Sequence, residues 1–287
     1  RSGRKIKGGG IMTAGELLRF GAHNLGSDKQ FEVQLLLAKV LQTERALLLA
    51  HTDKEVSEEE EAEFKKMIHE RAEHKPLQYL LGTANFYGRD FIVNENVLIP
   101  RFDTEILAAR AVELAKAVPM AKIADICTGS GAIAVTISAE CSNAEVWASD
   151  ISAQALAVAE KNNQQIGANV KFLKGDLLAP FAAHSLHGYF DLLVSNPPYI
   201  TQAEMAELDA EVLEEHLALF GGEDGLDFYR RILAEAKAFL KTGGRLLLEV
   251  GYRQADDVKL LFEENNWREV RFHQDFQGIN RVVEASL

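Results

Sequence analysis

"AKIADICTGSGAIAVTISAE", residues 121–140, runs from an apolar β-strand pattern through a glycine-containing turn into a helical pattern. Gly129 and Gly131 remove side chains where a backbone must come close to a ligand. The turn is not a phosphate loop, because no Gly-Lys-Ser/Thr follows, and Ala134 stands at the last glycine of the dinucleotide fingerprint. The stretch therefore predicts a strand–turn–helix unit of a parallel sheet, whose turn either binds a ligand or only connects the two elements.

Strand and helix patterns alternate from Asp103 onward. Strand patterns cover residues 121–126, 144–149, 170–174, 191–195 and 245–250, and helix patterns cover residues 104–118, 132–140, 153–166, 227–241 and 254–265. This alternation predicts a doubly wound, mostly parallel α/β sheet over residues 103–287. Two final strand patterns, residues 268–273 and 281–286, flank Gly278 and predict an antiparallel hairpin at one edge of that sheet.

The chain before Asp103 has a different pattern. Residues 12–80 hold three capping-box signatures of helix starts, Thr13–Glu16, Ser27–Gln30 and Ser57–Glu60, and predict a small N-terminal helical domain. Residues 81–102 contain two glycines, aromatic residues and short alternating segments, which predict a hairpin linking two domains. Residues 1–11 are basic and Gly-rich, and we expect them to be a vector-derived leader outside the fold.

Composition narrows the class of protein. The chain has 287 residues, 47% of them hydrophobic, and no apolar run reaches the roughly eighteen residues that a membrane span requires. Two cysteines, Cys127 and Cys141, are too few for a disulfide framework or a thiolate zinc site, and the scattered histidines predict no metal. We therefore expect a cytoplasmic protein without membrane or metal, and a monomer.

Charge argues against a nucleic-acid substrate. The net charge is −12, and residues 103–287 carry all of the excess, with 16 Lys+Arg against 28 Asp+Glu. Proteins that grip phosphate backbones usually present a basic face. We therefore do not expect a nucleic-acid partner.

Three acids stand at the ends of three successive strand patterns. Asp125 precedes the glycine turn, Asp150 ends the second strand 25 positions later, and Asp176 follows the third. Asp150 either holds both hydroxyls of a ribose or caps the helix that starts near Ser152, and Asp176 can accept from an adenine amino group. Because the carboxyl ends of parallel strands face one crevice, the acids predict an adenosine site without phosphate contacts. S-adenosylmethionine fits such a site better than NAD does.

"VSNPPYIT", residues 194–201, follows the fourth strand of the alternation and carries Asn196 to the same edge. Pro197 and Pro198 have fixed φ and no N–H, so their carbonyls can point outward as acceptors. The Asn196 side chain offers a further acceptor. Alternatively, the two prolines only end a strand. Because these acceptors and the flat ring of Tyr199 lie beside the predicted adenosine site, we interpret them as a site that holds a planar NH2 group.

A planar amino group is a poor nucleophile because its lone pair is delocalised. Hydrogen bonds from both N–H groups to fixed acceptors would favour a tetrahedral nitrogen and stabilise the positive charge that develops during attack on a methyl group. No strong base is required, because the proton can leave afterwards to water. The sequence thus predicts methyl transfer to a planar amino nitrogen.

With "NPPY", the stretches "NFYGRDFIVNENVLIPR" (85–101), "VLIPRFDTEIL" (97–107), "DICTGSGAIA" (125–134) and "GGEDGLDFYRRIL" (221–233) resemble the protein-(glutamine-N5) methyltransferases of class-I peptide chain release factors. The resemblance runs from about Thr13 to Val283. It implies a class-I, Rossmann-like methyltransferase domain with a mostly parallel seven-stranded sheet, and an N-terminal helical bundle that recognises the release factor. It also implies that the substrate is the glutamine of the Gly-Gly-Gln tip, with S-adenosylmethionine as methyl donor and S-adenosylhomocysteine as product.

The resemblance also assigns residues by position. It implies catalytic roles for Asn196, Pro197 and Tyr199, and substrate contacts for these three together with Pro198 and Phe102. It implies that the cofactor contacts Asp125, Cys127, Thr128, Gly129, Ser130, Gly131, Asp150, Asp176, Leu177 and Asn196.

Two positions depart from the family pattern. Cys127 stands where many methyltransferases have a glycine, so its backbone must be accommodating there, and we interpret its side chain as packed rather than nucleophilic. Phe102 stands where the family more often has proline, and it either walls the site or only packs the hinge.

Some assignments stay open. Arg101, Asp103 and Glu105 either close over the cofactor or form a hinge ion pair, and "FGGEDGLD", residues 220–227, is expected to be a mobile acidic loop near the site that contacts substrate or only connects. The alternative activity is a DNA or RNA adenine N6-methyltransferase, which also presents a planar NH2 group. A third alternative is a non-catalytic adenosine-binding scaffold, for which two aimed acceptors would have no use.

Overall fold

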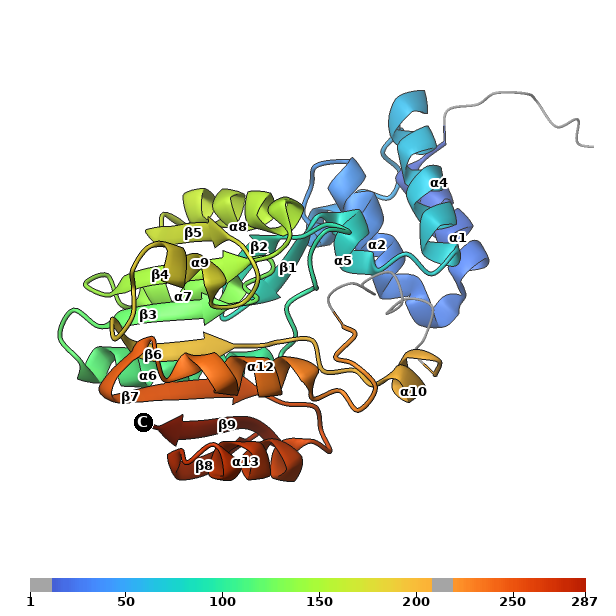
Figure 1. Cartoon of the computed structure of the whole chain (residues 1–287). Coiled ribbons are helices and arrows are strands. Elements are labelled where there is room, and N and C mark those ends of the chain that lie inside the picture. The colour runs from blue at the N-terminus through green and yellow to red at the C-terminus, as the bar shows by residue number, and fades with distance from the viewer. Residues whose placement is uncertain (1–11, 208–218) are drawn as a thin grey trace, which may run out of the picture. The chain divides into compact units, whose positions relative to one another are not determined.

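The protein is described by a computed structural model over residues 12–207 and 219–287 (Figure 1). The chain divides into two compact units, one ending at Gly82 and the other spanning Thr83–Leu287. The expected leader, residues 1–11, lies outside the described residues. Within the described ranges, no helix combines the length and the apolar character needed to span a membrane.

The first unit is a helical bundle. Its helices are α1 (Ala14–Leu25), the 3₁₀ turn η1 (Ser27–Lys29), α2 (Gln30–Val40), α3 (Arg45–Ala50), α4 (Glu58–Ala72) and α5 (Leu77–Leu81). Leu17 from α1, Leu37 from α2 and Phe64 from α4 are completely buried in its core. This unit confirms the predicted helical character of the N-terminal part.

Two of the three predicted capping boxes form. The hydroxyls of Thr13 and Ser57 each accept from the backbone N–H three residues later. In return, the backbone N–H of each donates to the carboxylate of that later residue, Glu16 or Glu60. The box predicted at Ser27 is wrong, because Ser27 opens a 3₁₀ turn instead of preceding an α-helix. Gly26, with φ +99°, ends α1 directly before this turn. After the turn, α2 starts at Gln30 without a side-chain cap.

The second unit begins with the predicted hairpin. Strands β1 (Thr83–Phe86) and β2 (Arg89–Ile92) pair antiparallel, with Phe86 opposite Arg89. The hairpin is shorter than the predicted range, since helix α5 occupies residues up to Leu81 and residues 93–103 form no strand. Asn162 secures the end of β2: its amide accepts from the Ile92 N–H at 2.6 Å and donates to the Ile92 carbonyl at 3.0 Å.

The predicted sheet class is confirmed. The sheet has seven strands in the order β5-β4-β3-β6-β7-β9-β8. Its strands are β3 (Lys122–Ile126), β4 (Glu145–Asp150), β5 (Val170–Lys174), β6 (Phe190–Ser195), β7 (Leu240–Glu249), β8 (Arg268–Gln274) and β9 (Asn280–Ser286). Neighbours among β3 to β7 are parallel, and β9 pairs antiparallel with both β7 and β8, which forms the predicted edge hairpin.

Helices cover both faces of this sheet (Figure 1). They are α6 (Thr104–Ala117), α7 (Ala132–Glu140), α8 (Ala153–Ile166), α9 (Ala179–Ala183), α12 (Asp227–Ala236) and α13 (Ala255–Glu264). A further short helix, α10 (Gln202–Met205), does not cover the sheet (Figure 1). Successive residues of a strand enter opposite cores: Ile123 packs with α6 and α7, and Ala124 packs with α9, α12 and α13. Burial on both faces explains why the strands are continuous apolar runs instead of alternating ones.

The strand order reverses at β3. From β3 the chain passes to β4 and β5 on one side, and then returns to β6 and β7 on the other. In an open α/β sheet, ligands bind outside the carboxyl ends of the strands at such a switch point. The turn after β3, Asp150 at the end of β4 and Asn196 after β6 all lie at this edge.

Candidate active site

The turn after β3 combines an open position with a tightly packed one. Cys127, Gly129 and Gly131 all have positive φ, of +61°, +55° and +80°, which confirms that the Cys127 backbone adopts a conformation usual for glycine. A Cβ added at Gly129 would meet nothing within 4 Å, whereas one at Gly131 would lie 3.1 Å from the Ala159 Cβ of α8. Gly131 thus permits close helix packing, and Gly129 leaves room for a ligand beside the backbone.

Asp125 holds this turn from beneath. Its side chain is completely buried, and its Oδ2 accepts from the Thr128 hydroxyl at 2.6 Å and from the Ala134 N–H at 3.2 Å. Burial raises the pKa of Asp125 to about 7, although these two hydrogen bonds lower it. A direct contact with a cofactor, as expected from the sequence, would need exposed surface that Asp125 lacks. Asp125 fixes the turn that faces the crevice.

Cys127 is not an activated thiol. Burial raises the pKa of its side chain, and the nearby carboxyls of Asp150 and Asp125 act in the same direction. The thiolate is the reactive form of cysteine, and here it is disfavoured. The side chains of Thr128 and Ser130 are buried and that of Cys127 is half-buried, so the backbone of the turn is the part suited to a ligand.

Asp150 connects the end of β4 to the glycine turn. Its Oδ2 accepts from the Gly129 N–H at 2.8 Å, and its Oδ1 accepts from the Ser152 N–H at 2.9 Å. The side-chain cap of α8 is Ser152 itself, whose hydroxyl accepts from the Ala155 N–H at 3.1 Å. Since each carboxylate oxygen has more than one acceptor position, Asp150 retains capacity to accept from two hydroxyl groups.

Asp176 and Leu177 have other contacts than those expected. The carboxyl of Asp176 is about half exposed and forms an ion pair with Arg231 of α12 through its Oδ2, which leaves its other oxygen as an acceptor. The Leu177 side chain is buried in the core of the second unit, and the Leu177 carbonyl accepts from the Ser149 hydroxyl at 2.9 Å. The Leu177 side chain is thus closed to a ligand, while a contact between Asp176 and the adenine stays a prediction.

Two oxygens of the "NPPY" segment are left as acceptors. Asn196 Nδ2 donates to Thr104 Oγ1 at 3.3 Å. Among the residues that the structure describes, none donates a hydrogen bond to Asn196 Oδ1 or to the Pro197 carbonyl. The Pro198 carbonyl lies against Gly221, where an added Cβ would be 2.8 Å from its oxygen. No described residue donates to the Pro198 carbonyl either, and Pro197 is buried whereas Pro198 is half-buried, so the role of the Pro197 carbonyl as an acceptor stays a prediction.

Both the backbone carbonyl and the ring of Tyr199 have contacts. Its carbonyl accepts from Gln254 Nε2 at 2.9 Å, and its ring packs partly buried against the core of the second unit. Burial raises the pKa of the Tyr199 phenol, so the ring stays neutral and is not a general base.

The loop after the undescribed residues 208–218 lies against this segment. The Ile200 N–H donates to the Leu219 carbonyl at 2.8 Å, and the Gly221 N–H donates to the Ile200 carbonyl at 2.9 Å. A Cβ on Gly221 would lie 2.6 Å from Tyr199 Cα, so only glycine permits this approach. The "FGGEDGLD" segment is therefore packed beside "NPPY", near the site as expected.

Phe102 and Phe276 form an exposed aromatic pair in the second unit. Their exposed fractions are 65% and 90%, and their rings stack with centroids 6.1 Å apart. Beside them, Arg281 pairs with Asp103 and with Asp275, each at 2.9 Å. Asp103 therefore forms an ion pair, one of the alternatives that the sequence left open, and Phe102 lies in open surface instead of being packed.

Sequence reasoning missed two side chains beside Asn196. Thr104 was interpreted only as the start of a helix, yet its hydroxyl contacts Asn196. Glu249 ends β7, the parallel neighbour of β6, and is buried. The rule that selected Asp150, an acid at the carboxyl end of a strand, applies equally to Glu249 in "RLLLEV" and would have found it.

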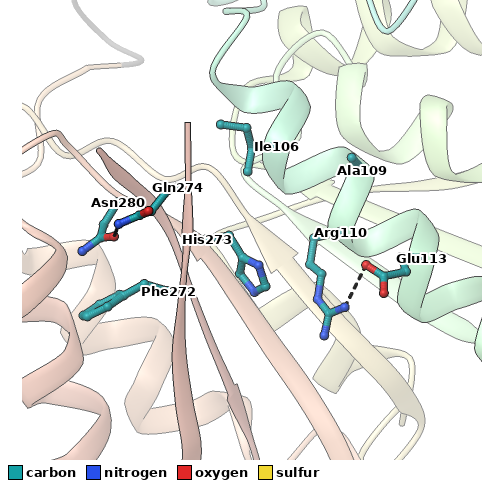
Figure 2. Close-up of a pocket in the computed structure, with 8 residues that line it drawn as sticks. All are labelled: Ile106, Ala109, Arg110, Glu113, Phe272, His273, Gln274 and Asn280. Atoms are coloured by element: carbon teal, nitrogen blue, oxygen red, sulfur yellow. Dashed lines mark hydrogen bonds and ion pairs between the residues drawn. The ribbon is translucent and has the colours of Figure 1, made fainter. Parts of the chain in front are cut away.

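A separate pocket lies between α6 and the β8–β9 hairpin (Figure 2). Arg110 and His273 at this pocket both hydrogen-bond Glu284, a completely buried carboxylate on β9. Arg245 reaches the same carboxylate at 2.6 Å. Although burial raises the pKa of Glu284, hydrogen bonds from His273 and Arg110 outweigh it and hold that pKa below its usual range. The basic side chains compensate the charge of Glu284, and the hydrogen bonds between Arg110 and Glu284 link α6 to β9.

Glu284→Gln should therefore lower stability without lowering turnover. The variant leaves Arg110 and Arg245 without their carboxylate, but both guanidinium groups are partly exposed, so we expect a loss on the order of 2 kcal/mol in the free energy of unfolding. Because the pKa of Glu284 is depressed, this contribution is present at neutral pH and is lost as the pH falls below the ordinary range of a glutamate. Urea unfolding at neutral and acidic pH measures both. Equal stability of variant and wild type at neutral pH would contradict this account.

Comparison with known proteins agrees with the fold. Two family models match the chain, "PrmC N-terminal domain" over residues 16–82 and "Methyltransferase small domain" over residues 104–217. A release factor glutamine methyltransferase of Bacillus cereus is 40% identical over 263 residues, which cover 88% of this chain and 91% of that protein. One from Geobacter sulfurreducens is also 40% identical, over 96% of this chain and 94% of that protein.

A solved structure supports the fold. The crystal structure of a methyltransferase from Pyrococcus furiosus matches with a TM-score of 0.51 and 18% identity, over 70% of this chain and 90% of that one. The parallel sheet with its switch point, glycine turn and strand-end acid defines a methyltransferase of the Rossmann-like, S-adenosylmethionine-dependent class. Within this class, the chain belongs to the release factor glutamine methyltransferase family.

Proposed function

We propose that this protein transfers a methyl group from S-adenosylmethionine to the side-chain amide nitrogen of the glutamine in the Gly-Gly-Gln motif of peptide chain release factors. Family membership, with 40% identity over nearly the whole chain, supports this reaction. The modification of a translation factor would take place in the cytoplasm. S-adenosylhomocysteine would be the second product.

The observation that carries the proposal is the orientation of Asn196. Its NH2 group is engaged by Thr104, so its Oδ1 is the end available to accept from a ligand. With the carbonyl of Pro197, it supplies two acceptors for the two N–H bonds of a primary amide. A glutamine side chain has this group, and its nitrogen would be aimed by both hydrogen bonds.

The residues at the cofactor edge fit S-adenosylmethionine. The open side of Gly129 would receive the methionine end along the backbone of residues 127–131, and the remaining acceptor positions of Asp150 would hold the ribose hydroxyls. When bound, the cofactor supplies an electrophilic methyl group. Asn196 and Pro197 would hold the glutamine nitrogen toward that methyl, and the neutral ring of Tyr199 would stack on the amide plane.

Two further parts would recognise the protein substrate. Phe102 is exposed beside the site and stacked on Phe276, which suits it to contact the backbone of a glycine-containing tip. The N-terminal helical unit, residues 12–80, would recognise the body of the release factor, and residues 81–102 would link it to the methyltransferase domain. We expect the enzyme to act as a monomer.

Peptide mapping tests the proposal. A release factor incubated with the enzyme and S-adenosylmethionine should gain one methyl group in the peptide that contains Gly-Gly-Gln, and fragmentation should place it on the glutamine side chain. Methylation confined to any other residue, or no methylation of the release factor, would overturn the proposal.

A further inference from the structure

Glu249 is a buried carboxylate next to the substrate-binding segment. Strands β6 and β7 are parallel, with Ser195 opposite Leu248, so Asn196 and Glu249 follow side by side at the carboxyl ends of the two strands. Only 3% of Glu249 is exposed. Its Oε2 has no hydrogen-bond partner among the described residues, and a buried polar atom of this kind requires an explanation.

The comparison with Glu284 shows what Glu249 lacks. Glu284 is equally buried, but Arg110, Arg245 and His273 bind it directly. Within residues 12–207 and 219–287, Glu249 has no such basic partner within ion-pair distance. Placing a carboxylate in an apolar core without a cation is costly, so Glu249 does not stabilise the fold as Glu284 does.

The groups that face Glu249 belong to the substrate site. The Thr104 hydroxyl and the Asn196 amide lie near its carboxyl and lower its pKa. Asn196 Nδ2 also donates to Thr104 Oγ1 at 3.3 Å. Thr104, itself buried at the start of α6, therefore accepts from Asn196 and keeps its own hydroxyl proton for another acceptor. The three side chains form one polar cluster, in which Asn196 and Thr104 are hydrogen-bonded.

We propose that Glu249 is a positioning residue for the methyl transfer: through Thr104 and directly, it fixes the Asn196 amide with its NH2 group inward and its Oδ1 toward the substrate. This inference rests on the proposed function of Asn196. Glu249 itself does not touch the substrate amide.

The chemistry of the three groups gives the cluster a direction. An ionised carboxylate only accepts hydrogen bonds, whereas a hydroxyl both donates and accepts, and an amide donates at one end and accepts at the other. With Glu249 as the acceptor-only end, Thr104 must donate toward it and accept from Asn196. A flipped Asn196 would place its oxygen against the carboxylate and present NH2 to the substrate NH2. The charge at Glu249 thus excludes the non-productive orientation.

The ionisation of Glu249 falls in the working range of pH. Burial raises its pKa to about 7, with the carboxyl of Asp103 also raising it, while the nearby Thr104 and Asn196 side chains and the charge of Arg281 lower it. Tyr199, and Tyr229, whose hydroxyl donates to the Glu249 carbonyl at 2.9 Å, also face it, and burial raises the pKa of both phenols, so they remain neutral. The productive form of Glu249 is present above about pH 7 and is lost as the pH falls.

Glu249→Gln is the direct test, because glutamine has the same shape and lacks the acceptor-only character. We expect kcat on a release factor to fall about tenfold to a hundredfold, as when an outer-shell partner is removed, with the Kd for S-adenosylmethionine unchanged. The fall in wild-type kcat below about pH 7 should be absent from the kcat profile of the variant. Since the variant removes a buried charge, its stability should be at least that of the wild type.

Two controls separate positioning from structure. Glu284→Gln, in an equally buried carboxylate, should lower stability and keep the wild-type kcat profile. In the Asn196→Ala background, Glu249→Gln should have no further effect on kcat, because a positioning residue acts only through its partner. Thr104→Val should resemble Glu249→Gln, and Thr104→Ser should restore turnover.

The outcomes distinguish the inference from the proposed function. If the wild type does not methylate the release factor, the proposed function fails before the variants are compared. If the wild type is active and Glu249→Gln keeps both its kcat and its acidic limb, the positioning role is wrong. Additive losses in the double variant would also overturn it.

Discussion

Asn196→Ala should lower kcat for release factor methylation by on the order of a hundredfold or more, while the Kd for S-adenosylmethionine stays near its wild-type value. The size of the loss is that expected for removal of one preorganised polar group in an active site. The physical reason is that alanine leaves the Pro197 carbonyl as the single fixed acceptor. The glutamine nitrogen would then be neither aimed nor made more tetrahedral.

Single-turnover kinetics with saturating cofactor measures this loss, and calorimetry measures cofactor binding. Asn96→Ala is a matched control, since Asn96 is an exposed asparagine whose side-chain amide bonds only to the nearby Asn94 among the described residues. It should retain wild-type kcat. Normal turnover by Asn196→Ala would refute the mechanism. A large loss of cofactor affinity would indicate that Asn196 binds the cofactor instead of the substrate.

Asp150→Ala should have the opposite profile and weaken S-adenosylmethionine on the order of a hundredfold. Two hydrogen bonds from ribose hydroxyls to a carboxylate are together worth roughly 3 kcal/mol, which corresponds to that change in Kd. The variant also releases the Gly129 N–H from its 2.8 Å hydrogen bond, so the turn loses its attachment to β4. At saturating cofactor, kcat should fall much less than it does in Asn196→Ala.

Asp176→Ala is the informative comparison for Asp150→Ala. The Asp176 carboxyl is ion-paired with Arg231 and about half exposed, so its removal should change cofactor affinity by only a few-fold. Asp150→Asn, which keeps one acceptor oxygen, should be intermediate. Equal losses of cofactor affinity in Asp150→Ala and Asp176→Ala would indicate that Asp176 contacts the adenine, as the sequence suggested.

Most of the fold could be predicted because its signals are local or periodic. Alternating strand and helix patterns identified the parallel sheet, and the pattern around Gly278 identified the edge hairpin. The failure at Ser27 has a local cause: the capping-box spacing was correct, but a 3₁₀ turn at Ser27–Lys29 displaced the start of α2. A spacing rule does not register a turn that is inserted between the cap and the helix.

The site was predicted less completely, because its partners lie far apart in the sequence. Asn196 could be selected from "NPPY" alone, but Thr104 stands 92 positions away from it, and no local pattern joins them. Asp125 was expected to reach the cofactor because acids at strand ends face the crevice. In the structure its side chain is buried beneath the glycine turn instead. Whether a strand-end acid is buried or exposed depends on the packing around its side chain and not on its position along the strand.

The measurement that tests the central claim most directly is methyl transfer from labelled S-adenosylmethionine, offered in parallel to three substrates. These are a release factor, the same factor with its Gly-Gly-Gln glutamine replaced by alanine, and duplex DNA. The account predicts label on the intact release factor only. Label on DNA, or equal label on the alanine variant, would contradict the assignment of the site at Asn196 and Pro197 to a protein glutamine.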